Sequence, residues 1–121
     1  MDVKTRKVEA LALLSSNRPL TRAEGRRLNE LTYQQNSQIS KEPFMHPVNY
    51  VDSLDGCMTL DTRGLYWSLF PADNVAILST EKRRLDFHEP QPRQARLSYA
   101  MLRAWWQAQP ERLPVDDRHY T

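Results

Sequence analysis

The positions of the eight prolines restrict where helices and strands can form in this 121-residue chain. Proline has no backbone N–H, and its ring collides with the preceding turn of a helix, so it is poorly tolerated inside helices and central strands. The prolines fall into five groups, at residues 19, 43–47, 71, 90–92 and 110–114. These groups predict where one element of secondary structure ends and the next begins.

Two helices are predicted within residues 1–38. Residues 3–15 have a helical composition and a leucine-rich apolar arc. After a short turn, Thr21 and Glu24 have the spacing of a capping box, in which the threonine hydroxyl accepts from a backbone amide and the glutamate reaches back to the cap. This box predicts a second helix from residue 21 to about residue 35, despite a cost of about 1 kcal/mol for Gly25. We expect the two helices to form a hairpin.

The middle of the chain, residues 48–88, has the pattern of β structure. Apolar runs at Cys57–Leu60 and Leu65–Phe70 flank residues 61–64, whose sequence DTRG is typical of a hairpin turn with glycine late in it. Residues 75–79 are predicted as a third strand. A helix capped by Asp73 remains an alternative for residues 74–88, because periodicity alone does not separate strand from helix in short apolar runs.

One amphipathic helix is predicted within residues 93–109, followed by a tail at residues 110–121. Trp105 and Trp106 are neighbours in this helix. Adjacent helical residues point about 100° apart, so the two indoles cannot share one narrow apolar stripe. Either the helix is buried on more than half of its circumference, or one aromatic face is kept for a partner.

Our leading interpretation assigns Trp105 to the core, because it continues Leu97 and Met101 at four-residue spacing. The second face would then meet a partner. Tryptophan, tyrosine and arginine are favoured in protein interfaces, and all three types occur here. The predicted partner-binding residues on this face and its borders are Tyr99, Leu102, Trp106, Arg96 and Arg103. The alternative is that both indoles are internal, with the helix placed between the helical hairpin and the sheet.

Together these segments predict a single α+β domain over residues 1–121, with an N-terminal helical hairpin, a small antiparallel β-sheet and a C-terminal amphipathic helix. A chain of this length normally folds as one unit. Strands cannot bury their apolar side alone, so we expect the helices from both ends of the chain to cover one face of the sheet.

The chain has no apolar run near the roughly 18 residues of a membrane span, and its first residues lack the pattern of a signal peptide. A single cysteine excludes an internal disulfide and fits a reducing compartment, so we expect a cytoplasmic protein. The potential metal ligands are scattered without the spacing of a metal site, at Cys57, His46, His88 and His119. We therefore expect no metal, no cofactor and no membrane partner.

Arginine outnumbers lysine 13 to 4, and a guanidinium group matches two oxygens of a phosphate or carboxylate at once. Four residues of the second predicted helix share one face: Arg22, Arg26, Asn29 and Tyr33. Side chains of these types can bind a phosphate backbone and contact bases. A basic run follows later, at Lys82, Arg83 and Arg84. These residues predict nucleic-acid binding as an alternative function, although a solvated polar helix face is the plainer interpretation.

The sequence has no recognisable catalytic motif. Cys57 lies in an apolar run, which favours packing over a nucleophilic role, and Asp52–Gly56 is typical of a turn. The sequence therefore predicts a non-catalytic interaction protein rather than an enzyme. Its size and composition suit a bacterial or phage inhibitor, adaptor or assembly factor that binds a protein partner, or a second copy of itself, through the aromatic and arginine surface of the last helix.

Overall fold

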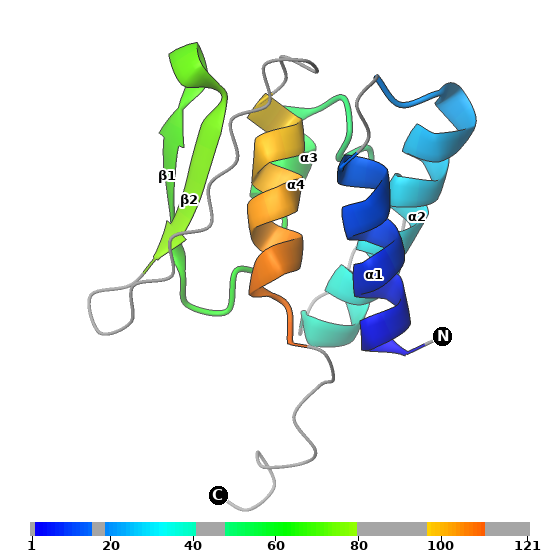
Figure 1. The fold of residues 1–121 in the computed structure, drawn as a ribbon. Helices are drawn as coiled ribbons and strands as arrows, with labels where there is room; N and C mark the ends of the chain where they lie inside the picture. Colours follow the sequence, from blue (N-terminus) through cyan, green and yellow to red (C-terminus); the bar gives the residue numbers. More distant parts are fainter. Residues whose placement is uncertain (1, 16–18, 41–47, 80–96, 111–121) are drawn as a thin grey trace, which may run out of the picture.

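Along the chain, three helices come first, two antiparallel strands follow, and one further helix comes last (Figure 1). The computed structural model describes residues 2–15, 19–40, 48–79 and 97–110. Within these residues the elements are α1 Val3–Leu14, α2 Arg22–Ile39, α3 Leu54–Met58, β1 Tyr66–Phe70, β2 Val75–Ser79 and α4 Leu97–Ala108. The predicted α+β class is confirmed, with its N-terminal helices, antiparallel sheet and C-terminal helix.

Side-chain caps set the starts of the two N-terminal helices. Asp2 Oδ1 accepts a hydrogen bond from the Thr5 amide at 2.8 Å before α1. Before α2, the Glu24 amide donates to Thr21 Oγ1 at 3.1 Å and the Thr21 amide donates to Glu24 Oε1 at 2.9 Å, which confirms the capping box. The helix continues to Ile39, past its predicted end at residue 35, and its later turns bury Gln35 and Asn36.

The strand predicted at Cys57–Leu60 is wrong, because its first residues belong to helix α3. Ser53 Oγ accepts from the Gly56 amide at 3.1 Å and caps this helix, where a simple turn was expected. Gly56 packs so closely on the preceding segment that a Cβ would lie 2.1 Å from the Asn49 carbonyl oxygen. The predicted turn at residues 61–64 does form, with Arg63 and Gly64 at positive φ, but it leads from α3 to β1.

β1 and β2 form an antiparallel hairpin in which Tyr66 pairs with Ser79 and Phe70 with Val75. A 3-10 turn at Pro71–Asp73 joins the strands, and Asn74 completes the reversal with a φ of 52°. The strand predicted at residues 75–79 is confirmed, and the helical alternative is wrong for these residues. Residues 80–88 lie outside the described residues.

α4 lies between the hairpin of strands and the N-terminal helices (Figure 1). It packs against β2 on one side and against α1 on the other, and nine of its twelve residues are buried. The expectation that both helical ends cover the sheet is therefore wrong: α4 covers it, and α1 packs mainly on the opposite side of α4. Burial from two sides explains why this helix has apolar residues around most of its circumference.

A buried polar network ties the end of α4 to the N-terminal helices. Arg6 donates through Nε and Nη2 to Gln35 Oε1, at 3.1 and 3.0 Å, and through Nη2 to Gln38 Oε1. Gln35 Nε2 donates in turn to Gln109 Oε1 at 2.9 Å, and Lys7 Nζ donates to the Gln109 carbonyl at 2.7 Å. Because buried polar groups must find partners, this network fixes how α4 sits against α1 and α2.

Candidate functional site

Both neighbouring tryptophans of α4 are fully buried. Trp105 and Trp106 have no exposed surface, and their rings meet edge to face with centroids 5.1 Å apart and planes at 84°. Trp105 Nε1 donates to the Asp61 carbonyl at 3.0 Å, while Trp106 Nε1 donates to Thr32 Oγ1 on α2 at 3.0 Å. The core position predicted for Trp105 is confirmed. The exposed position predicted for Trp106 is wrong.

The rest of the predicted partner-binding face is also occupied within the fold. Tyr99 and Leu102 are buried like Trp106: α1 packs against α4, and Thr32 of α2 accepts from the Trp106 indole. Arg103 is half-buried and donates through Nη1 to Ser15 Oγ at 2.9 Å. Arg96 lies outside the described residues. The structure thus follows the alternative that we kept open, in which both indoles are internal.

The other predicted face, on α2, reaches the surface, with Asn29 half-buried at its centre. Arg22 and Arg26 are exposed and Tyr33 is half-buried. Asn29 instead holds the segment at residues 49–51: its Oδ1 accepts from the Tyr50 and Val51 amides at 2.8 and 3.0 Å, and its Nδ2 donates to Asn49 Oδ1 at 3.2 Å. These hydrogen bonds use both lone pairs of the amide oxygen and one Nδ2–H, so Asn29 holds the segment at residues 49–51 in place.

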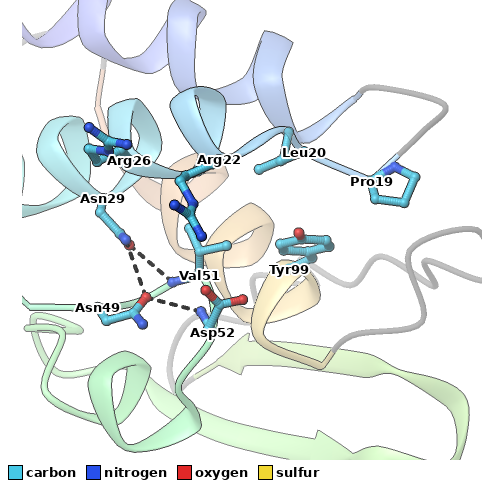
Figure 2. A pocket seen from close by; sticks show the side chains of 10 residues that line it. Pro19, Leu20, Arg22, Arg26, Asn29, Asn49, Val51, Asp52 and Tyr99 are labelled. Carbon is cyan, nitrogen blue, oxygen red and sulfur yellow. Dashed lines mark hydrogen bonds between the residues drawn. The ribbon is translucent and has the colours of Figure 1, made fainter.

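Two adjoining pockets follow this face of α2, and we call them together the α2 groove. The first, of about 300 Å³, lies between the start of α2, residues 49–52 and the start of α4 (Figure 2). The second, of about 390 Å³, is lined by Arg26, Asn29, Glu30, Tyr33, Val48 and Asn49. Arg26, Asn29 and Asn49 line both pockets, so the two lie next to each other along the helix.

Arginine side chains in the described parts of this fold are used in two different ways. Arg27 binds Glu9 Oε2 at 2.6 Å and Glu30 Oε1 at 2.7 Å, and the hydrogen bond to Arg27 lowers the pKa of Glu9. Arg22 and Arg26 form no hydrogen bond or ion pair with any described residue, although Asp52 and Glu30 line the same groove. Figure 2 shows Arg22 extending from α2 in the direction of Val51 and Asp52. Two guanidinium groups thus remain available to an anionic ligand.

A second candidate surface, which the sequence reasoning missed, is the side of the β-hairpin that faces away from α4. We call it the hairpin outer face; it consists of Tyr66, Ser68, Phe70, Val75, Ile77 and Ser79. Tyr66 is 70% exposed and Phe70 is 49% exposed. Ala76 and Leu78, on the inner face, are buried. The alternation in β1 was a weak signal, since apolar and aromatic residues occur on both of its faces.

The predicted packing role of Cys57 is confirmed, because its side chain is completely buried. Its Sγ donates to the Tyr50 carbonyl at 3.2 Å, and burial raises the pKa of the thiol to about 12. The thiol is therefore protonated at neutral pH, and only the thiolate is an effective nucleophile.

Within the described ranges, no group of three His, Cys, Asp or Glu side chains is placed to hold a metal ion. Of the helices in those ranges, none is long and apolar enough to cross a membrane. The basic run Lys82, Arg83 and Arg84 lies outside the described residues. Comparisons of the chain with protein-family models, curated proteins and solved structures found no match.

Proposed function

We propose that this chain is a small non-catalytic protein that binds another polypeptide through the hairpin outer face. The observation that carries the proposal is the exposure of Tyr66 and Phe70 on a surface formed entirely by uncharged residues. Contiguous exposed apolar patches are uncommon on folded monomers and mark interaction sites, and aromatic side chains supply large contact areas at such sites. The α4 face that we first assigned to the partner is excluded from this role by its burial.

The strands themselves support this assignment. A hairpin of two strands is marginally stable alone, and among the described residues α4 is the element that packs on one of its faces. Strand edges in natural proteins usually carry charged residues or proline that prevent pairing with other chains. β1 and β2 contain neither. We therefore expect the partner to present an apolar surface and to pair with a strand edge, in the mode called β-augmentation.

The non-catalytic part of the proposal is supported by the state of Cys57, whose buried and protonated thiol is unsuited to nucleophilic attack. We further propose a cytoplasmic location, in which this free cysteine stays reduced. A protein of this kind would act as an adaptor, an inhibitor or an assembly factor in a bacterium or phage, because binding alone is sufficient for these roles.

The experiment compares Tyr66→Thr/Phe70→Thr with a matched control, Val8→Thr. Threonine retains a high β-propensity, so the double variant keeps the hairpin while it removes both aromatic groups. Val8 is 62% exposed on α1 and tests the loss of an exposed apolar side chain elsewhere. Circular dichroism should show all three proteins folded. Sedimentation velocity then tests binding to a second copy, and affinity capture from the source cell tests binding to a different protein.

We expect a complex with the wild type and with Val8→Thr, weakened by about 30-fold or more in the double variant, as for an interface hot spot of about 2 kcal/mol. Self-association lost in this way would identify the partner as a second copy of the chain. If the folded double variant retains every complex that the wild type forms, the hairpin outer face is not the binding surface.

A further inference from the structure

We infer that the α2 groove binds a single-stranded nucleic acid, with Arg22 and Arg26 on its phosphates and Tyr33 stacked on a base. This inference is independent of the proposed function, which uses the hairpin outer face. It rests on three properties of the groove: its unpaired cations, its two-part shape and its rigid floor.

The cations are the first property. Arg22 and Arg26 are exposed, line the groove and have no hydrogen-bonding or ionic partner in the described part of the chain. They lie four residues apart on α2, which is about 6 Å along the helix axis. At that spacing two forked guanidinium groups can hold one phosphate or two successive phosphates, with two donors directed at each pair of oxygens.

The shape of the groove favours a nucleotide over a simple anion. The pocket next to Arg26 is lined by Tyr33 and Val48, so a flat apolar group can enter it beside the cation. Tyr33 lies seven residues beyond Arg26, or about 10 Å along the helix axis. A base attached to a phosphate held by Arg26 can stack there only if it is unpaired, because a duplex keeps its bases in the helical stack.

The floor of the groove is fixed before any ligand binds. Asn29 accepts from the Tyr50 and Val51 amides, and Asn49 Oδ1 accepts from the Asp52 amide at 3.2 Å. Figure 2 shows the hydrogen bonds that join Asn29, Asn49, Val51 and Asp52 beside the first pocket. A preformed site loses little conformational freedom on binding. Asp52 also lines this pocket, and its carboxylate opposes the two arginines.

The test is fluorescence anisotropy with a labelled single-stranded oligonucleotide of about 12 nucleotides, at salt concentrations from about 50 to 200 mM. Arg22→Gln/Arg26→Gln removes both cations of the groove. Lys4→Gln/Arg63→Gln is the matched control, because it removes two exposed charges on α1 and the turn before β1 and changes the net charge equally. Tyr33→Leu removes the aromatic face and keeps an apolar side chain, and Asp52→Asn removes the opposing charge. Melting curves confirm that each variant is folded.

We expect the wild type and the control to bind alike. The arginine variant should bind at least about tenfold more weakly at low salt, and the slope of log K against log salt should fall by about 1.4, because each lost phosphate contact removes about 0.7. Tyr33→Leu should weaken binding about fivefold or more with the salt slope unchanged, as expected for lost stacking. Asp52→Asn should tighten binding, a gain that a merely structural role would not produce.

Several results would overturn the inference. The first is that the wild type does not bind the oligonucleotide at low salt. The second is that Lys4→Gln/Arg63→Gln loses as much affinity for the oligonucleotide as Arg22→Gln/Arg26→Gln. Tighter binding of a duplex, insensitive to Tyr33, would exclude a single strand. Binding of polyglutamate with the same dependence on the arginines and none on Tyr33 would assign the groove to an acidic protein. Equal affinity for adenosine monophosphate and for the oligonucleotide would assign it to a free nucleotide instead.

Discussion

The hydrogen bond between Trp106 and Thr32 predicts a measurable coupling between α4 and α2. Both side chains are completely buried, and Trp106 Nε1 donates to Thr32 Oγ1 at 3.0 Å. Thr32→Val removes the acceptor and leaves a buried N–H unpaired, which costs about 1–3 kcal/mol. Trp106→Phe leaves the threonine hydroxyl unpaired and adds a cavity term. The double variant leaves neither group unpaired, so we expect it to be about 1–3 kcal/mol less destabilised than the sum of the single variants.

Urea unfolding, followed by circular dichroism, measures these free energies. A domain of this size has a total stability of about 5–15 kcal/mol, so the single variants should remain folded in the absence of urea. The control cycle combines Thr32→Val with Trp67→Phe, since β1 lies on the other side of α4 from α2 (Figure 1). That pair should be additive within about 0.5 kcal/mol. Additivity of the Trp106 and Thr32 substitutions as well would refute the argument that this hydrogen bond joins the two helices.

Further predictions concern the caps, the glycines and the buried thiol. Thr21→Ala should lower the free energy of unfolding by about 1 kcal/mol, because it removes the cap of α2. Leu28→Ala should lower it by about 2–5 kcal/mol, because Leu28 is buried in the core. Equal effects of the two substitutions in urea titrations would contradict these roles. Gly25→Ala should raise the melting temperature, because alanine has the higher helix propensity and its Cβ would meet Val51 at an ordinary contact distance of 3.8 Å. Gly56→Ala should lower the melting temperature, because its Cβ would lie 2.1 Å from the Asn49 carbonyl oxygen. Burial raises the pKa of Cys57 from 9.0 to about 12, so the unfolded thiol loses its proton first and the free energy of unfolding should fall as the pH rises from about 9 toward 12. Cys57→Ala should reduce this fall in urea titrations at about pH 8 and pH 10, and an unchanged fall would show that the thiol does not contribute to it.

Local signals predicted the elements whose starts depend on neighbouring residues. The capping box at Thr21 and Glu24 needs only residues within one turn, and the structure contains both of its hydrogen bonds. The region around Cys57 shows where such signals fail. Its apolar run fits a strand or a helix equally, and the helical outcome follows from the Ser53 cap and from the close packing of Gly56 on Asn49. Cap and contact together outweigh the weak strand preference of a few residues.

On α2, too, the sequence predicted one part of the candidate site and missed another. Helical spacing was sufficient to place Arg22, Arg26 and Tyr33 on one side of α2, and all three line the groove. Spacing gave no indication that Asn29, on the same side, would be occupied by the amides of residues 50 and 51. Those partners come from a segment about twenty residues away along the chain, and no local pattern specifies which segment will pack there.

The sequence by itself determined the three longer helices, the capping box before α2, the α+β class and the burial of Trp105, since each depends on periodicity or on residues close together in the chain. Only the tertiary structure decided which surfaces stay open. α4 is amphipathic in a way that permits an exposed aromatic face. Trp106 is nevertheless buried, because α1 packs on α4 and Thr32 of α2 meets the Trp106 indole, while β2 covers the other side. The exposed aromatic residues are instead Tyr66 and Phe70, because a sheet of two strands has two faces and α4 covers one of them. Burial depends on the partner that an element meets, and that partner is chosen by the packing of the whole chain.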